Sequence, residues 1–393
     1  MRRLPAALLA WIFTVTSAAL GQRTWIVDAS NPPGTDFTNL PPALLAASDG
    51  DTILVRSGVY DPAVTSRGVT LLGFGATIVA RPIGGSGLER ALLVDGLPHG
   101  HRFVMRGFQL QGPATNQHAA EIRSCAGVVV LANVHASPGQ GDAHSLRISE
   151  SADVSVLHST LSGGLRASGS RVWLRDTHVY GPIAQSRFGS LRNYAQPACV
   201  GSQSEISVCG GSLIGGHGLI GLAPDQSAMQ LEDCTTRLAT GSGLFLRTGS
   251  YAGTLTFVIS ANGGTLDLDP SIPLSIGGNS TVSLRRVPAM NAAPTSIGSV
   301  LSLDLYAVPG DAFQIFLGLR ADPIALGAFG TLWIEPSALF VVGSGTLDAF
   351  GSTSRGILVP NDPWFQGIVM RAQALRYGAA GTSLTDPATV LIY

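Results

Sequence analysis

The chain has 393 residues, with 24 arginines, no lysine and a formal net charge of −1. Charged residues make up 12% of it and hydrophobic residues 45%, which excludes a disordered polyelectrolyte and a solvated coiled coil. The near-neutral charge gives no indication of a surface for nucleic acid. Because lysine is absent, Schiff-base chemistry and a phosphate-binding P-loop are excluded too.

The first 21 residues have the pattern of a secretory signal peptide. Two arginines precede the apolar stretch 4–20, and Ala19 and Gly21 are the small residues of a cleavage site. We therefore expect the mature chain to begin at Gln22 and to be secreted or held in the cell envelope, in an extracellular or periplasmic location. No later stretch is long and apolar enough to span a membrane, so no membrane span is expected after removal of the signal.

The N-terminal part of the mature chain predicts a strand, a short helix and a second strand. Residues 24–30 have the composition of a strand, and Asn39 can cap a helix with two prolines in its first turn. Leu40, Leu44 and Ala47 would share one face of that helix. Residues 51–55 then alternate as a strand and end in a Ser-Gly turn.

Five segments between residues 120 and 239 repeat one pattern. Each has an apolar pair two residues apart, followed three residues later by a small or polar residue. Both side chains of such a pair lie on one face of a strand. We expect a coil of three short strands per turn, with the pairs stacked in one core and the residue between them, such as Ser155, facing solvent. The pairs are Val128/Val130, Val154/Val156, Val172/Leu174, Ile206/Val208 and Met229/Leu231, and the small residues, expected to form a ladder at a turn, are Asn133, Ser159, Thr177, Gly211 and Cys234.

The pattern changes after about residue 240. The strand-like runs become longer and alternate more cleanly, and Pro, Gly, Asn and Asp turns separate them. This predicts an antiparallel β-sandwich.

Two parts of the chain resemble known secreted proteins. The helix, the strand GDTILVRSGVY at 50–60 and the repeats resemble right-handed parallel β-helix proteins of the pectin-lyase-like kind from bacteria. GTLWIEP at 330–336, VPNDP at 359–363 and QGIVMRAQAL at 366–375 resemble a C-terminal β module of secreted bacterial proteins. The expected fold class is therefore all-β: a right-handed parallel β-helix with a short N-terminal capping helix, followed by an antiparallel β-sandwich-like domain. The expected boundaries are 1–21 for the signal, 22–240 for the β-helix, 241–290 for linking strands and 291–393 for the module.

The resemblance brings enzymes into consideration, because many parallel β-helix proteins are polysaccharide lyases or glycoside hydrolases. Such enzymes need grouped or paired carboxylates, whereas the acids of this coil are scattered. Gly216-His217-Gly218 matches one polygalacturonase motif, but the aspartate motifs of that family are missing. We favour a non-catalytic protein that binds polysaccharide or other surface components, without cofactor, metal or nucleic acid. The lyase or hydrolase remains the alternative.

Candidate binding residues come from one turn and one insertion. His158 and Asp176 would be neighbours on successive turns of the coil, and the insertion 181–197 is rich in arginine and aromatic residues. The alternatives are a solvated polar turn and a tolerated insertion. The candidates are His158, Arg175, Asp176, His178, Arg187, Phe188, Arg192 and Tyr194.

The four cysteines leave two alternatives open. An exported protein can form disulfides, and an even number of cysteines is compatible with two. A buried unpaired cysteine is also a common core filler. No C-x-x-C pair indicates a metal or redox site. The cysteines are Cys125, Cys199, Cys209 and Cys234.

Overall fold

The computed structural model describes residues 22–82, 89–113, 117–139, 144–183, 185–187, 190–193, 195–217, 226–249, 258–272, 275–379 and 381–393, and every count below refers to these. The expected signal peptide lies outside them. The fold is all-β, with one short α-helix and two 3-10 turns, η2 (Gly327–Phe329) and η3 (Pro363–Phe365). None of the described helices combines the length and hydropathy needed to cross a bilayer.

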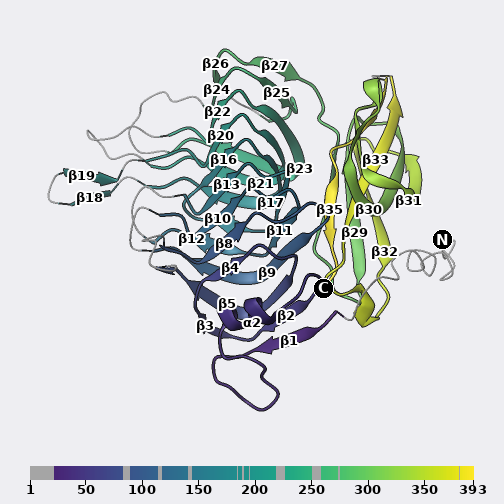
Figure 1. Cartoon of the computed structure of the whole chain (residues 1–393). Helices are drawn as coiled ribbons and strands as arrows, with labels where there is room; N and C mark the ends of the chain where they lie inside the picture. The colour runs from purple at the N-terminus through teal and green to yellow at the C-terminus, as the bar shows by residue number, and fades with distance from the viewer. Residues whose placement is uncertain are drawn as a thin grey trace.

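The first two-thirds of the chain winds into a parallel coil (Figure 1). One wall is a 14-stranded sheet and the other a 9-stranded sheet, and each turn adds strands in parallel to the turn before. The 14-stranded sheet contains β1 (Thr24–Val27), β2 (Thr52–Val55), β3 (Gly58–Tyr60), β5 (Thr70–Val79), β9 (Arg102–Gln111), β11 (Val128–Ala132), β12 (His135–Ser137), β14 (Asp153–Leu157), β15 (Thr160–Leu161), β17 (Arg171–Tyr180), β21 (Glu205–Ile214), β23 (Thr235–Arg247), β25 (Thr265–Leu268) and β27 (Thr281–Leu284). The 9-stranded sheet contains β4 (Ala63–Thr65), β8 (Leu92–Asp95), β10 (Ala120–Arg123), β13 (Leu146–Ser149), β16 (Leu165–Ser168), β20 (Cys199–Ser202), β22 (Met229–Glu232), β24 (Ile259–Asn262) and β26 (Ile276–Gly278). Two hairpins, β6 (Arg81–Pro82) with β7 (Glu89–Arg90) and β18 (Gln185–Arg187) with β19 (Ser190–Asn193), lie outside both walls.

A left-handed residue bends the long strands of the 14-stranded sheet and gives the coil three faces. In β17, Val172 and Leu174 point inward, Asp176 takes a φ of 45°, and Thr177 and Val179 point inward beyond it. The first half of such a strand forms one face, the second half forms another, and the 9-stranded sheet forms the third.

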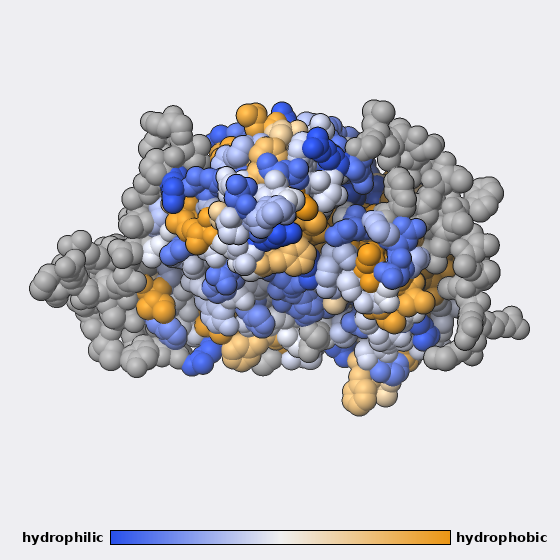
Figure 2. Space-filling view, turned by 90° about the horizontal axis from the view of Figure 1, so that it is seen from below, coloured by the Kyte–Doolittle hydropathy of each residue, from blue (hydrophilic) through white to orange (hydrophobic). Residues whose placement is uncertain are grey.

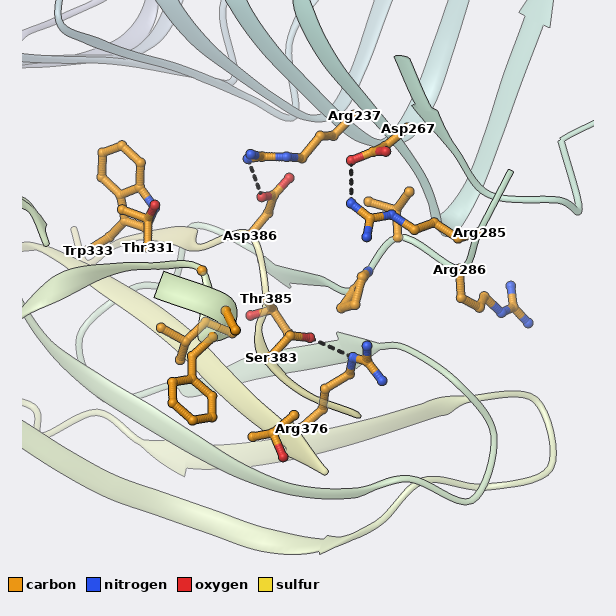
Figure 3. Close-up of a pocket in the computed structure, with 17 residues that line it drawn as sticks. Arg237, Asp267, Arg285, Arg286, Thr331, Trp333, Arg376, Ser383, Thr385 and Asp386 are labelled. Atoms are coloured by element: carbon orange, nitrogen blue, oxygen red, sulfur yellow. Dashed lines mark hydrogen bonds and ion pairs between the residues drawn. The ribbon is translucent and has the colours of Figure 1, made fainter. Parts of the chain in front are cut away.

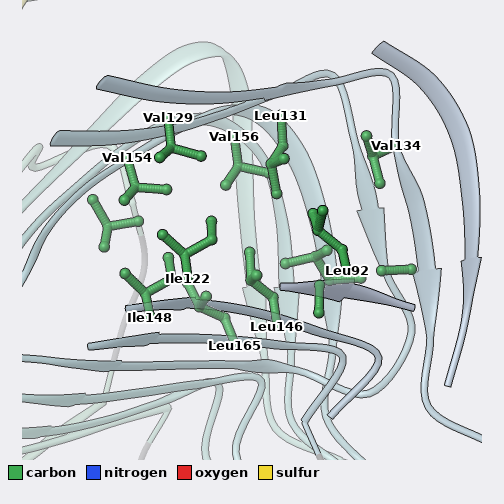
Figure 4. Close-up of a cluster of buried hydrophobic side chains, with 14 of the residues drawn as sticks. Leu92, Ile122, Val129, Leu131, Val134, Leu146, Ile148, Val154, Val156 and Leu165 are labelled. Atoms are coloured by element: carbon green, nitrogen blue, oxygen red, sulfur yellow. The ribbon is translucent and has the colours of Figure 1, made fainter. Parts of the chain in front are cut away.

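The core of the coil is a stack of apolar side chains from successive turns (Figure 4). Val154, Val156, Val172, Leu174, Ile206 and Val208 all belong to it, as the repeat predicted. Met229 and Leu231 also belong to the core, but they lie in β22 of the 9-stranded sheet, so the predicted equivalence of this pair with the others was wrong. The prediction for β11 was wrong by one residue: Val129 and Leu131 pair with Val154 and Val156. Val128 and Val130 therefore point outward, because a shift of one residue reverses the face of every side chain in a strand.

Ladders of small side chains line two corners of the coil. At the corner that precedes the 14-stranded sheet, each hydroxyl accepts a hydrogen bond from the turn before and donates to the carbonyl two residues earlier. Ser170 Oγ, for example, accepts from Ser151 N at 3.0 Å and donates to Ser168 O at 2.7 Å. Cys125 and Cys234 hold equivalent positions at the two ends of this ladder. The predicted ladder combined two corners: Ser159 and Thr177 belong to the bend within the long strands, and Cys234 does not.

Helix α2 (Leu40–Ala46) begins as predicted. The Asn39 side chain accepts a hydrogen bond from the Leu40 amide at 2.9 Å, and prolines occupy the first turn. Leu40, Leu44 and Ala47 are buried in the core of the coil.

Parallel pairing continues past residue 240. β24 and β26 extend the 9-stranded sheet, and β25 and β27 extend the 14-stranded sheet as far as Leu284. Strands expected to link two domains thus add turns to the coil, and the antiparallel sheets of the C-terminal part start at Ala289.

The C-terminal module consists of two antiparallel sheets that share one cluster of buried side chains, including Leu303, Ile315 and Ala374. One sheet contains β28 (Ala289–Ala292), β29 (Val300–Tyr306) and β32 (Ser352–Leu358). The other contains β30 (Ala312–Ala325), β31 (Thr331–Thr346), β33 (Val369–Gly378), β34 (Gly381–Leu384) and β35 (Ala388–Leu391).

The module lies against the coil face formed by the first halves of the long strands (Figure 1). Asp153 points outward there and accepts hydrogen bonds from Arg371 at 2.5 Å, Arg320 at 2.8 Å and Trp173 Nε1 at 3.0 Å. Ser155 also points outward, but it is fully buried and bonded to Thr389 at 2.7 Å. The expectation that Ser155 faces solvent was wrong, because the module covers this face.

The surface at the α2 end of the coil is chemically mixed. Figure 2 views the molecule from this end and shows hydrophobic residues in several small groups among hydrophilic ones. Exposed apolar side chains such as Leu45 and Val59 are ordinary features of a protein surface.

Candidate functional site

The predicted His158–Asp176 pair lies at the bend of two successive turns. Both residues are left-handed, with φ of 46° and 45°, and His158 N donates to Arg175 O at 2.9 Å. His158 Nε2 is 3.9 Å from Asp176 Oδ2. Asp176 also accepts a hydrogen bond from Asn291 of the module. The two side chains are thus neighbours as expected, at the edge of the covered face, and their binding role stays a prediction.

Arg175 is turned away from solvent. Its side chain is 1% exposed and donates to Ser207 O at 3.1 Å and to Pro387 O at 3.1 Å. It points outward from the first half of β17, the half that the module covers. In this structure Arg175 therefore holds coil and module together and is closed to an external ligand.

His178, in the second half of β17, is open to solvent. It pairs in register with Thr160 before it and Ser212 after it, and its Nδ1 lies 2.9 Å from Ser212 Oγ. Side chains in register on neighbouring strands share a face, so these residues form part of a row along the coil. We call this row and its neighbour the exposed strip. The first row is Gln109, His135, Thr160, His178, the buried Ser212, and Phe245. The second row has two stretches, Gln111 with Ser137 and Tyr180 with Ile214 and Arg247.

The residues predicted in the insertion are only partly described. Arg187 and Arg192 lie in the antiparallel hairpin of β18 and β19, which projects from the coil on the side away from the module (Figure 1). Phe188 and Tyr194 lie outside the described residues, as do the side chains of the two arginines. A binding role for this insertion stays a prediction.

All four cysteines are free and buried. Cys199 and Cys209 are fully buried, and burial raises the pKa of each thiol to about 12. A thiol of this kind is not a nucleophile at neutral pH. The sequence left open whether the cysteines form disulfides or are buried and unpaired, and in this structure they are buried and unpaired.

A pocket of about 310 Å³ lies where the last turns of the coil meet the module (Figure 3). Arg237, Arg285 and Asp267 reach it from the coil, and Arg376 and Asp386 reach it from the module. Phe329 lines the pocket and is 49% exposed. The remaining lining residues are Arg286, Val287, Pro288, Ala328, Gly330, Thr331, Trp333, Thr382, Ser383, Leu384 and Thr385.

Ion pairs order the charged side chains of this interdomain pocket. Arg237 Nη1 donates to Asp386 Oδ1 at 3.0 Å and to Glu205 Oε1 at 3.1 Å. Arg285 Nη2 donates to Asp267 Oδ2 at 2.7 Å, and Arg376 Nη1 donates to the buried Asp311 at 2.9 Å. Each arginine thus has a carboxylate partner.

Sequence reasoning missed this pocket. Arg285 and Asp386 are about a hundred residues apart, and neither belongs to a repeat or motif. The adjacent Arg285 and Arg286 were the only local signal, since arginine pairs are uncommon in a chain of 12% charged residues.

A second hollow is a shallow groove along the corner of four successive turns. It has a volume of about 740 Å³ and is lined by Glu150, Arg171, Gln203 and Glu205 together with small residues. Arg171 Nε donates to Glu205 Oε2 at 2.7 Å. Within the described ranges, no group of three or more His, Cys, Asp or Glu residues could hold a metal ion.

Comparisons with known proteins assign the chain to no family. No protein-family model and no curated protein matches the chain. One solved structure that it resembles is full-length tailspike protein 2 from the Escherichia coli O157:H7 bacteriophage CAB120, with 12% identity and a TM-score of 0.27. The match covers 84% of this chain and 56% of the tailspike chain, so this chain spans little more than half of that protein.

Proposed function

We propose that this is a secreted, non-catalytic β-helix protein that binds an extracellular or cell-envelope polysaccharide, or another surface component, along the exposed strip. The signal-peptide pattern of residues 1–21 supports export. The observation that carries the proposal is the register of the strip, in which outward-pointing side chains repeat on successive strands and, apart from the buried Ser212, are exposed or half-buried.

The chemistry of the strip suits an extended, hydroxyl-rich polymer. Neighbouring strands lie about 4.8 Å apart, so a chain laid along the coil axis meets a new side chain at every turn. Gln109 and His178 offer hydrogen-bond donors and acceptors to sugar hydroxyls. Tyr180 and Phe245 are 39% and 54% exposed and offer apolar ring faces to sugar rings.

Binding along the strip is tested by affinity gel electrophoresis of the whole protein against soluble polysaccharides, neutral (dextran, mannan, xyloglucan) and acidic (alginate, polygalacturonate). We expect retardation by at least one polymer and its loss in the double variant Tyr180→Ala/Phe245→Ala. Phe350→Ala is the matched control, because Phe350 is an aromatic residue of the module that is 81% exposed. Retardation that survives the double variant would contradict the assignment to the strip.

The alternative is a polysaccharide lyase or glycoside hydrolase. The observation that favours it is the groove that contains both Glu150 and Glu205. Against it, both carboxylate oxygens of Glu205 are already bound, one by Arg171 and the other by Arg237. We expect no turnover of polygalacturonate with or without calcium. Unsaturated products or new reducing ends formed at a rate typical of enzymes, about 1–10³ s⁻¹, would favour the alternative.

A further inference from the structure

The interdomain pocket of Figure 3 has more hydrogen-bond donors than its own residues use. Arg237 and Arg285 each use only Nη1 or Nη2, which leaves Nε and the second terminal nitrogen of each side chain. Arg376 uses Nε for Ser383 and Nη1 for Asp311, which leaves Nη2. These remaining nitrogens make no hydrogen bond within the described part of the chain.

The acceptors in the pocket do not match this surplus. Both oxygens of Asp386 are occupied, Oδ1 by Arg237 and Oδ2 by Ser207 at 2.7 Å. The Thr385 hydroxyl already accepts from Ala374 N at 3.0 Å. A ligand in this pocket must therefore bring acceptor atoms, and guanidinium groups bind the oxygens of carboxylates and phosphates most strongly.

The ion pairs do not prevent such a ligand from binding. The side chain of Arg285 is 65% exposed, so its pair with Asp267 is solvated and contributes little. Its free nitrogens can be shared with an incoming anion. Phe329, which lines the pocket and is partly exposed, can cover the carbon part of the same molecule, and the volume of the pocket is that of a small-ligand site.

We propose that this pocket binds the oxyanion group of a small molecule or polymer branch, a carboxylate or a phosphate, through Arg285 of the coil and Arg376 of the module. Because the ligand would contact both parts of the molecule, it would also hold the module on the coil. The pocket and the exposed strip share no residue, so this proposal does not depend on the proposed function.

The test is isothermal titration calorimetry of the whole protein with inorganic phosphate, succinate and the neutral analogue succinamide. We expect phosphate or succinate to bind and succinamide not to bind; whichever anion binds identifies the ligand class. In Arg285→Gln, the dissociation constant should rise about tenfold, since a charge-assisted hydrogen bond is lost. Arg56→Gln is the matched control, because Arg56 is 48% exposed and paired with Asp28 elsewhere on the coil.

Three results would overturn the proposal: no binding of either anion, equal binding of succinamide, or an unchanged dissociation constant in Arg285→Gln. The double variant Tyr180→Ala/Phe245→Ala should retain anion binding. A loss of polysaccharide retardation together with retained anion binding would separate the two sites.

Discussion

Trp173 and Leu174 are adjacent in one strand and belong to different cores. Leu174 points inward and joins the stack of the coil. Trp173 points outward, donates to Asp153 and packs edge-on against Trp333 of the module, with ring centroids 5.3 Å apart. The alternation of side chains along a strand sets whether a residue points into or out of the coil. The packing of the module then decides whether an outward-pointing residue is exposed to solvent or buried.

This distinction predicts graded effects of introducing a carboxylate. Val172→Asp should lower the free energy of unfolding by more than about 4 kcal/mol, because the new charge has no partner in the core. Ser155→Asp should cost less, since the coil core stays intact and Arg371 is nearby, but it should loosen the module. Urea melts followed by circular dichroism and by tryptophan fluorescence measure both effects.

Ser137→Asp is the control for these variants, because Ser137 is half-buried on the exposed strip, in the part of the coil beyond the bend and not on the face against which the module packs. Its melt should match that of the parent within about 0.5 kcal/mol. If Ser155→Asp left the free energy of unfolding equally unchanged, the conclusion that the module covers this face of the coil would be contradicted.

His144 makes stability depend on pH. Its side chain is 3% exposed, and burial, with a contribution from His118, lowers the pKa of the imidazole to about 4. The unfolded chain binds a proton near pH 6.5, so His144 contributes stability above that pH and loses it as the pH falls toward 4. We expect the free energy of unfolding to decrease by about 3 kcal/mol over this range.

His144→Gln should flatten this dependence. A smaller slope should remain, because burial also lowers the pKa of His118. Urea melts at half-unit intervals between pH 4 and 7 measure the slope in both proteins. An identical slope in the variant would contradict the assignment.

At the scale of the element, two corners of the coil hold left-handed residues in successive turns: the bend within the long strands and the corner that follows the strands of the 9-stranded sheet. At the corner after the 9-stranded sheet, different turns place different residue types in this conformation. Gly169 and Gly263 have φ of 56° and 67°, whereas Gln203 and Asp233 have φ of 49° and 50°. A side chain in this region strains the backbone, and glycine does not.

Gln203→Gly should therefore raise the free energy of unfolding by about 0.5–1 kcal/mol. Gln230→Gly is the matched control: Gln230 is also an exposed glutamine, but it lies in β22, where glycine should lower stability by about the same amount. Thermal melts of both variants measure these changes. A loss of stability in Gln203→Gly would mean that residue 203 does not have a left-handed backbone conformation.

At the scale of the whole molecule, buried charges join coil and module. Burial alone would raise the pKa of Asp153, but Arg371 and Arg320 lower it below its ordinary value. The carboxylate is thus ionised and fully enclosed, with Arg371 itself 1% exposed. Such a pair fixes the docking position, since each charge needs the other.

Arg371→Met should lower the free energy of unfolding by about 3–5 kcal/mol, because Asp153 keeps its charge without its main partner. The double variant Asp153→Asn/Arg371→Met should recover part of this loss. Arg123→Met is the control, since Arg123 and Asp95 form a pair that is 39% exposed on both sides and should cost less than about 1 kcal/mol. Urea melts give all three values; an equal cost for Arg371→Met and Arg123→Met would contradict the buried docking pair.

Much of the fold was predictable because its information is local. The cap at Asn39 and the inward pairs of β14, β17 and β21 follow from spacing within a few residues. β11 was misassigned by one residue because it is apolar on both sides: Val129 faces the coil core, whereas Val130 packs under Val369 and Leu391 of the module. Alternation cannot reveal direction in a strand that is buried on both faces.

The sequence by itself determined a capped N-terminal helix, a parallel coil with an apolar stack and a change of architecture toward the C-terminus, since each depends on residues close together in the chain. Only the tertiary structure decided which coil face is covered, that Arg175 is enclosed while His178 is open, and that Arg285 and Arg376 share a pocket. These features depend on the packing of the module against the coil, which joins segments about a hundred or more residues apart in the chain. The shape of the two surfaces and their buried charges determine this packing, and the periodicity of the sequence carries no information about it.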